Sequence, residues 1–178
     1  MRQLHPISTA LIHQNPWWQY RRDEYEHPDG SPGEFFYIRT KGSVLVIPVL
    51  DDGRIVLLNQ FRYLNQQESL EFVGGGVKEG MTLEDAARAE LLEEAGYDAG
   101  MLVRLGDFNP MNGATDELCT VFRAAGLKEV GAKPEISEEF DPRAVTIDEL
   151  IGLVASGEVW DGMTLAAFAI YRILADTL

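Results

Sequence analysis

Residues 74–97, GGGVKEGMTLEDAARAELLEEAGY, carry the most informative pattern of the chain. Thr82 followed by Asp85 is a variant of the capping box, in which a side-chain oxygen accepts a hydrogen bond from the first turn of a helix. Apolar residues then recur every four positions and predict one buried helix face: Leu83, Ala87 and Leu91. Gly96 offers the left-handed conformation that commonly ends a helix. We therefore expect a helix over residues 83–95, directly after a glycine triplet.

Three carboxylates lie on one face of this expected helix. Offsets of three and four residues hold them within an arc of roughly 100°: Glu90, Glu93 and Glu94. No lysine or arginine lies three or four residues from any of them, and each like-charge pair costs roughly a few tenths of a kcal/mol. The negative end of the helix dipole is also near. Two explanations of this face are open: it is solvated and held by ion pairs, or it binds a cation. The absence of basic residues at these spacings favours the cation.

The residue types narrow the choice of cation. Carboxylate oxygens suit Mg²⁺ or Mn²⁺ better than Zn²⁺, and the three histidines are dispersed rather than set at zinc-binding spacing. Gly74, Gly75 and Gly76 would let the backbone approach a ligand and turn a carbonyl toward a metal. The alternative for these glycines is a tight turn.

The first third of the chain is rich in β-branched and aromatic residues, as is typical of strands. Residues 35–38 form one short run of this kind. Residues 44–50 and 55–61 flank an Asp-Gly turn signal at positions 52 and 53, so we expect them to pair as a β-hairpin. Pro48 would lie at an edge or a bulge, because proline cannot donate to a strand ladder.

The chain after the expected helix has fewer regular patterns. Residues 118–124 resemble another strand, whereas residues 126–144 are polar and acidic, which predicts a loop region. Two further helices are expected over residues 147–155 and 164–174. Strands mixed with a few helices, without strict alternation, predict an α+β fold or an α/β/α sandwich.

Composition limits the classes of function. The chain has 178 residues, a length that predicts a single domain over residues 1–178, and its formal net charge is -14. Nucleic-acid polymers and anionic lipids both require a basic surface, so we expect neither as a partner. No apolar run reaches the length of about 20 residues that crosses a bilayer. The single cysteine, Cys119, indicates a reducing compartment, and the start lacks the order of a signal peptide, so we expect a cytoplasmic protein.

The spacing from Gly75 to Tyr97 resembles the Nudix box, G-x5-E-x7-R-E-U-x-E-E-x-G-U, where U is aliphatic or aromatic. All spacings match, but the first glutamate of the pattern is Met81 here and its arginine is Ala89. These two residues usually pair with each other in the family, so the loss of both leaves no orphan charge. The three glutamates of the helix face are retained, and we expect an intact metal site.

The wider chain is similar to the ADP-ribose pyrophosphatase branch of the Nudix hydrolases. That similarity is carried by residues 59–63 (NQFRY), Glu71-Phe72 and residues 112–117 (NGATDE). It implies a Nudix-like α/β/α sandwich with a mixed β-sheet. It also implies a divalent-metal-dependent enzyme that cleaves the diphosphate of ADP-ribose, or of a related nucleoside diphosphate sugar, to a nucleoside monophosphate and a sugar phosphate.

The resemblance also implies roles for particular residues. The carbonyl of Gly74 and the carboxylates of the helix face, Glu90, Glu93 and Glu94, would bind Mg²⁺, with Mn²⁺ as the alternative. Glu93 and Glu94 would thereby take part in catalysis. A general base is expected on the loop after Pro134, where Glu139 is preferred over Glu135 and Glu138, and Glu93 is an alternative to all three.

Substrate contacts are implied in the same way. Arg62 matches an arginine that contacts the substrate, and Glu117 matches a glutamate that contacts the ribose. For each, an exposed structural residue is the alternative. Trp17 and Trp18 would stack on the base or be buried at a subunit contact. Family members commonly dimerise through N-terminal strands, so residues 1–40 are expected to form a homodimer.

Two other functions fit the same residues. One is a Nudix hydrolase of another pyrophosphate, such as a dinucleoside polyphosphate or a nucleoside triphosphate. The other is a non-catalytic sensor that binds nucleotide sugars, which the departures at Met81 and Ala89 suggest.

Overall fold

The computed structural model describes residues 4–132 and 139–174. These residues form ten strands and three helices. In chain order they are β1 (Pro6–Gln14), β2 (Gln19–Glu26), β3 (Pro32–Arg39), β4 (Ser43–Pro48), β5 (Ile55–Arg62), β6 (Gln67–Glu71), β7 (Val73–Gly76), α1 (Leu83–Ala95), β8 (Tyr97–Phe108), β9 (Cys119–Glu129), β10 (Asp141–Val145), α2 (Ile147–Ser156) and α3 (Gly162–Leu174).

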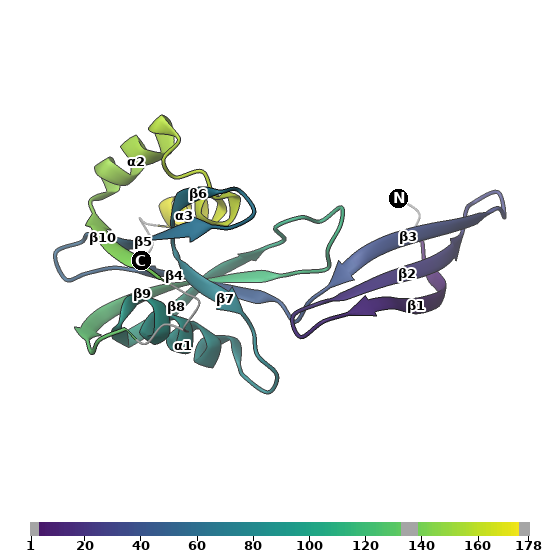
Figure 1. The fold of residues 1–178 in the computed structure, drawn as a ribbon, viewed down its shortest axis with the longest axis horizontal. Coiled ribbons are helices and arrows are strands. Elements are labelled where there is room, and N and C mark those ends of the chain that lie inside the picture. Colours follow the sequence, from purple (N-terminus) through teal and green to yellow (C-terminus); the bar gives the residue numbers. More distant parts are fainter. Residues whose placement is uncertain (1–3, 133–138, 175–178) are drawn as a thin grey trace.

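The main body has helices on both sides of its sheets (Figure 1). One sheet has the order β7-β4-β9-β8 and the other the order β10-β5-β6. Strands β4 and β9 run parallel, while the other pairs are antiparallel. One apolar cluster packs under α1, and another lies between the sheets and the two C-terminal helices. The predicted α/β/α sandwich with mixed strand directions is confirmed.

The predicted hairpin between residues 44–50 and 55–61 is wrong, although its turn forms. Gly53 adopts φ 85°, and its N–H donates to the Leu50 carbonyl over 2.9 Å. After this turn the chain leaves the first sheet, because β4 pairs with β7 and β9 while β5 pairs with β6 and β10. A single bridge between Val49 and Ile55 joins the two strands. A local turn signal therefore identified the reversal but not the strand partners.

The other sequence-based elements are closer to the structure. The helices expected over residues 147–155 and 164–174 are α2 and α3. The strand expected at 118–124 continues to Glu129, and β10 begins at Asp141, so the loop predicted over residues 126–144 is too long. Pairing with β8 and β5, respectively, stabilises these polar segments as strands.

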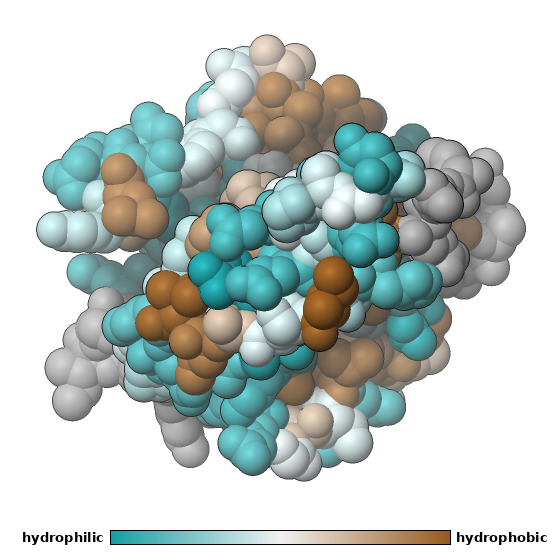
Figure 2. Space-filling model, turned by 90° about the vertical axis from the view of Figure 1, so that its right-hand side faces the viewer, coloured by the Kyte–Doolittle hydropathy of each residue, from teal (hydrophilic) through white to brown (hydrophobic). Residues whose placement is uncertain are grey.

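A separate three-stranded sheet, β1-β2-β3, projects from the main body (Figure 1). The loop between β8 and β9 fastens it: the Ile38 N–H donates to the Ala114 carbonyl over 2.9 Å, and Arg39 pairs with Asp116 over 2.9 Å. Large apolar side chains are exposed on this sheet: Ile7, Leu11, Ile12, Tyr20, Phe35 and Phe36. Figure 2 looks onto this end of the molecule and shows hydrophobic side chains open to solvent among polar ones.

None of the helices in residues 4–132 and 139–174 combines the length and apolar character needed to span a membrane.

Candidate active site

Helix α1 forms with the caps that the sequence predicts. The Thr82 side chain accepts a hydrogen bond from the Asp85 N–H over 3.1 Å, and Gly96 ends the helix at φ 73°. Ala87 and Leu91 are fully buried, but Leu83 is 36% exposed, so the buried face begins one turn later than predicted. Ala86 and Ala95 complete that face against the sheet. The acidic residues adjoin this face, and one of them, Glu94, is buried with it.

The glycine triplet lies in strand β7 rather than in a tight turn. A β-carbon at Gly74 would fall 2.4 Å from the Val44 carbonyl oxygen, and one at Gly75 would fall 2.6 Å from Oε1 of Glu90. At Gly74 the backbone of β4 leaves no space for a side chain, whereas at Gly75 a side chain would displace the Glu90 carboxylate. Gly74 thus allows close packing of β7 against β4, and Gly75 lets the Glu90 carboxylate of α1 lie against the backbone of β7, as the sequence suggested.

Each carboxylate of the helix face has its own surroundings. Glu94 is 7% exposed, and its Oε2 accepts a hydrogen bond from the Gly74 N–H over 3.0 Å. Glu90 is half-buried against Gly75. Glu93 is half-buried, and its Oε2 lies 3.7 Å from Nζ of Lys78. That lysine comes from the loop before the helix, so counting neighbours along the helix did not reveal it.

The donor set suits a hard divalent cation. All three side chains are carboxylates, and the glycine backbone lies against two of them, which fits the oxygen ligands that Mg²⁺ and Mn²⁺ prefer. Among the described residues, no three acidic, histidine or cysteine side chains are already gathered as a metal cluster. Binding a cation would therefore draw Glu93 and Glu94 away from their present contacts.

These carboxylates line a cleft of about 630 Å³ between the main body and the turn of the N-terminal sheet. The cleft brings together most of the site residues that the sequence predicts: Trp17, Trp18, Arg62, Gly74, Glu90, Glu93, Glu94 and Glu117. An acidic helix face, a glycine strand, an arginine and two tryptophans thus meet at one concave surface. A site of this kind fits a ligand with both an anionic and an aromatic part.

Arg62 lines the cleft and is hydrogen-bonded to the buried carboxylate of Glu71. Its Nε donates to Oε1 of Glu71 over 2.7 Å, and its Nη2 forms a second, short contact with Oε2. This hydrogen bonding raises the pKa of Arg62 above its already high ordinary value, so the guanidinium stays charged. Glu71 was part of the family resemblance but was not predicted as a site residue.

Glu117 and the tryptophans lie on other walls of the cleft. The Ser43 hydroxyl donates to Oε1 of Glu117 over 2.6 Å, which fixes the carboxylate beside strand β4. Trp17 and Trp18 occupy the turn between β1 and β2, where the backbone N–H groups of both donate to Oδ1 of Asn15. Trp17 is 76% exposed, whereas Trp18 is half-buried and packs against His13.

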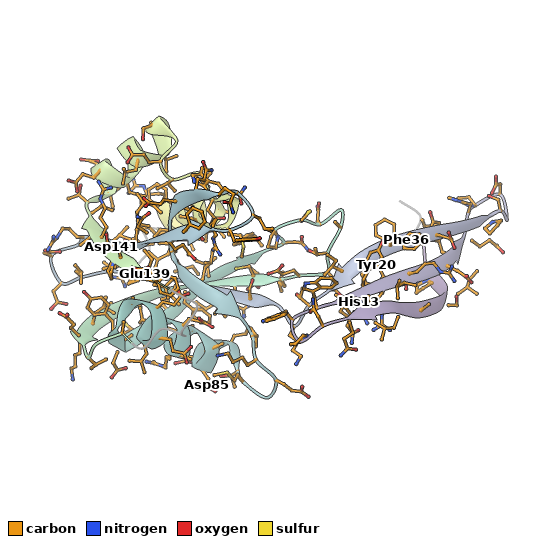
Figure 3. All side chains as sticks on the ribbon, in the orientation of Figure 1. His13, Tyr20, Phe36, Asp85, Glu139 and Asp141 are labelled. Atoms are coloured by element: carbon orange, nitrogen blue, oxygen red, sulfur yellow. The ribbon has the colours of Figure 1, made fainter. Side chains whose placement is uncertain are left out.

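Glu139 does not line this cleft in the described part of the chain. It is exposed and lies just before β10. Figure 3 shows Glu139 and Asp141 on the side of the main body away from the sheet that carries His13, Tyr20 and Phe36. The other two candidate bases, Glu135 and Glu138, fall outside the described residues.

The cleft also contains charged residues that sequence reasoning missed. They are Lys41, Glu71, Lys78, Glu79 and Asp161. Lys41 pairs with Glu79 over 3.1 Å and so ties the loop before α1 to the loop between β3 and β4. These residues come from loops and strand ends without periodic patterns, so the sequence contained no local signal for them.

Residues 39–168 match the family model of the NUDIX domain, and the chain therefore belongs to this family. It is 33% identical over 159 residues to the ADP-ribose pyrophosphatase of Bacillus subtilis, covering 88% of this chain and 85% of that protein. It is 29% identical to the methanol dehydrogenase activator of Bacillus methanolicus, covering 90% and 88%. A crystal structure described as an ADP compounds hydrolase covers 99% of this chain and 97% of its own, with TM-score 0.87 at 16% identity, which shows the shared fold.

Proposed function

We propose that this protein is a divalent-metal-dependent pyrophosphatase that hydrolyses ADP-ribose or a related nucleoside diphosphate sugar. The observation that carries the proposal is the single cleft in which the carboxylates of α1 face Arg62 and the Trp17-Trp18 turn. The similarity to a Bacillus subtilis ADP-ribose pyrophosphatase over most of both chains supports the same reaction class. The products would be a nucleoside monophosphate and a sugar phosphate.

The charge of the protein explains why a cation is needed. A chain with a formal net charge of -14 repels a diphosphate, and the cleft itself is rich in carboxylates. We propose Mg²⁺, with Mn²⁺ as a substitute, bound by Glu90, Glu93, Glu94 and the Gly74 carbonyl. Bound divalent ions would polarise the phosphoryl oxygens and lower the pKa of a water molecule.

Three other groups would hold the substrate. Arg62 presents a guanidinium whose remaining N–H groups suit phosphate oxygens. Glu117, held by Ser43, would accept hydrogen bonds from ribose hydroxyls. The indole of Trp17, exposed at the edge of the cleft, offers a face on which a base would stack.

The general base is proposed among two glutamates. Glu93 lines the cleft and is half-buried, whereas Glu139 is exposed outside it. A base must come within hydrogen-bond reach of the attacking water, which favours Glu93 on position. Comparing kcat of Glu139→Gln with that of the unmodified enzyme tests Glu139 as the base: loss of turnover would assign the role to Glu139.

We also propose that residues 1–40 form a homodimer contact. The projecting sheet leaves six large apolar side chains exposed, an arrangement that a second copy of the chain would cover. Sedimentation of the protein and of Phe36→Glu tests this: a dimer that dissociates in the variant is expected, and a monomeric starting protein would contradict it. A cytoplasmic location also remains a proposal, supported by the buried free thiol of Cys119.

A substrate panel tests the proposed reaction. ADP-ribose, ADP-glucose, GDP-mannose, a dinucleoside polyphosphate and ATP would be incubated with the protein and Mg²⁺, with chelator as control. Cleavage of one or more nucleotide sugars, lost on chelation, is expected. Turnover of triphosphates or dinucleotides alone would instead identify a different Nudix hydrolase. Binding of nucleotide sugars without cleavage would identify a sensor, in line with the missing pair at positions 81 and 89.

A further inference from the structure

The contact between Arg62 and Glu71 joins residues that are not opposite each other in their hairpin. In the pairing of β5 with β6, Arg62 lies opposite Gln67 and Glu71 lies opposite Leu58. The two side chains therefore lean toward each other along the sheet to bridge this offset in register. Both residues line the active-site cleft.

The two partners differ strongly in burial. The Glu71 side chain is 5% exposed and that of Arg62 is 47% exposed. The Gln60 amide also donates to Oε2 of Glu71, over 3.4 Å. Burial and the contact with Gln60 restrict the carboxylate independently of Arg62, whereas an arginine at a strand end has many rotamers. The surroundings of Glu71 thus fix its carboxylate, and the contact with that carboxylate determines where the Arg62 guanidinium lies.

The contact leaves part of the guanidinium available. The group has five N–H donors, and Glu71 uses one on Nε and one on Nη2. The remaining donors lie on the edge away from Glu71. Next along the chain, Tyr63 and Leu64 are 79% and 91% exposed, so an unheld Arg62 would be free to follow them into solvent.

We propose that Glu71 is a positioning residue that holds the Arg62 guanidinium in the cleft with its free edge toward the substrate diphosphate. This inference rests on the proposed function, because the diphosphate that the free edge would bind belongs to the proposed substrate. Holding the arginine in place before the substrate arrives lowers the conformational entropy lost on binding. A purely structural ion pair would instead stabilise the hairpin without affecting substrate affinity.

A double-mutant cycle separates these two roles. Arg62→Ala, Glu71→Gln and the double variant would be compared with the unmodified enzyme by KM, kcat and melting temperature, with the best nucleotide sugar and Mg²⁺. Each single change is expected to raise KM by about 10- to 100-fold, the loss that one charge-assisted hydrogen bond carries. The double variant is expected to be no worse than Arg62→Ala. If Arg62→Ala fails to fold, Arg62→Lys keeps a cation beside Glu71 and replaces it in the cycle.

Chemical rescue of activity by added guanidinium distinguishes the positioning role from a purely structural one. Added guanidinium is expected to restore part of the activity of Arg62→Ala, because Glu71 still binds the ion, and to have no effect on the double variant. Additive losses in the cycle, an unchanged KM in Glu71→Gln, or equal rescue of both variants would each overturn the proposal.

Failure of the proposed function would be seen separately, in the unmodified protein. If that protein cleaves no nucleotide sugar, the proposed reaction is wrong. The cycle would then be measured by calorimetric binding of pyrophosphate in the presence of Mg²⁺. Weaker, non-additive binding in the variants would support the positioning role, and unchanged binding would overturn it.

Discussion

Gly75 and Glu90 are packed so closely that a β-carbon on the glycine would fall 2.6 Å from a carboxylate oxygen. The Glu90 carboxylate can therefore occupy this position against β7 only because residue 75 has no side chain. Gly76, the next residue in the same strand, has open space around the equivalent position. The two neighbouring glycines form a natural pair of test and control.

Gly75→Ala is expected to lower kcat by 10-fold or more, since the added methyl group displaces Glu90 from the position proposed for metal binding. Gly76→Ala should retain activity within about twofold, because the added methyl group has open space and leaves the Glu90 carboxylate in place, although Gly76 also lines the cleft. Steady-state assays and melting curves of both variants check this. Equal activity in the two would contradict the role of the close approach.

Glu93→Gln and Glu94→Gln are each expected to reduce turnover by about 100-fold or more, since even outer-shell changes at metal sites cost 10- to 100-fold. In Glu94→Gln the amide oxygen of the new side chain can still accept a hydrogen bond from the Gly74 N–H, so the fold should remain. Calorimetric titration with Mg²⁺ should show weaker binding in both.

Glu84→Gln is the matched control for these two variants. It lies on the same helix and pairs with Arg88 over 3.1 Å, but it does not line the cleft. Normal activity is expected. Near-normal activity in Glu93→Gln and Glu94→Gln as well would refute the assigned metal face.

The two tryptophans should respond differently to replacement by alanine. Trp17 is 76% exposed at the cleft, so its loss is expected to raise KM with little change in melting temperature. Trp18 is half-buried against His13, with ring centroids 5.9 Å apart, so its loss should lower the melting temperature as well. Kinetics, thermal melts and sedimentation distinguish the effects. A lower melting temperature in Trp17→Ala with unchanged KM would contradict the proposed stacking.

Cys119 should resist alkylation in the folded protein. Burial raises the pKa of its thiol from 9.0 to about 11, so the reactive thiolate is scarce at pH 8. Because folding favours the protonated thiol, its contribution to stability is present below pH 9 and decreases as the pH rises toward 11. Labelling with iodoacetamide at pH 8, with and without denaturant, measures the difference. Rapid labelling of the folded protein would show that the thiol is accessible.

The parts of the fold that the sequence predicts are those with local causes. Helix α1 is specified by Thr82 at one end and Gly96 at the other, and α2 by a capping box between Thr146 and Glu149. These signals lie within a few residues of the element that they define. The acidic face followed from helix geometry for the same reason.

The parts that were missed depend on contacts between distant segments. The turn at Gly53 was correctly predicted, but no local residue specifies that the next strand joins another sheet. The ion pair of Lys78 with Glu93 and the placement of Arg62 by Glu71 likewise depend on how loops and strands meet in space. Resemblance to a family predicted most of the proposed substrate contacts, whereas helix periodicity predicted the shared face of the carboxylates.

The Trp17-Trp18 turn belongs to the projecting sheet, whereas the acidic helix belongs to the main body. The backbone hydrogen bonds and the Arg39–Asp116 pair at the end of β3 hold the projecting sheet in position relative to the main body. The proposed contact with the base and the proposed metal site therefore lie on separate pieces of the architecture. Under the proposed stacking of the base on Trp17, a short exchange over residues 15–18 would change which nucleotides are accepted and leave the carboxylates of α1 in place.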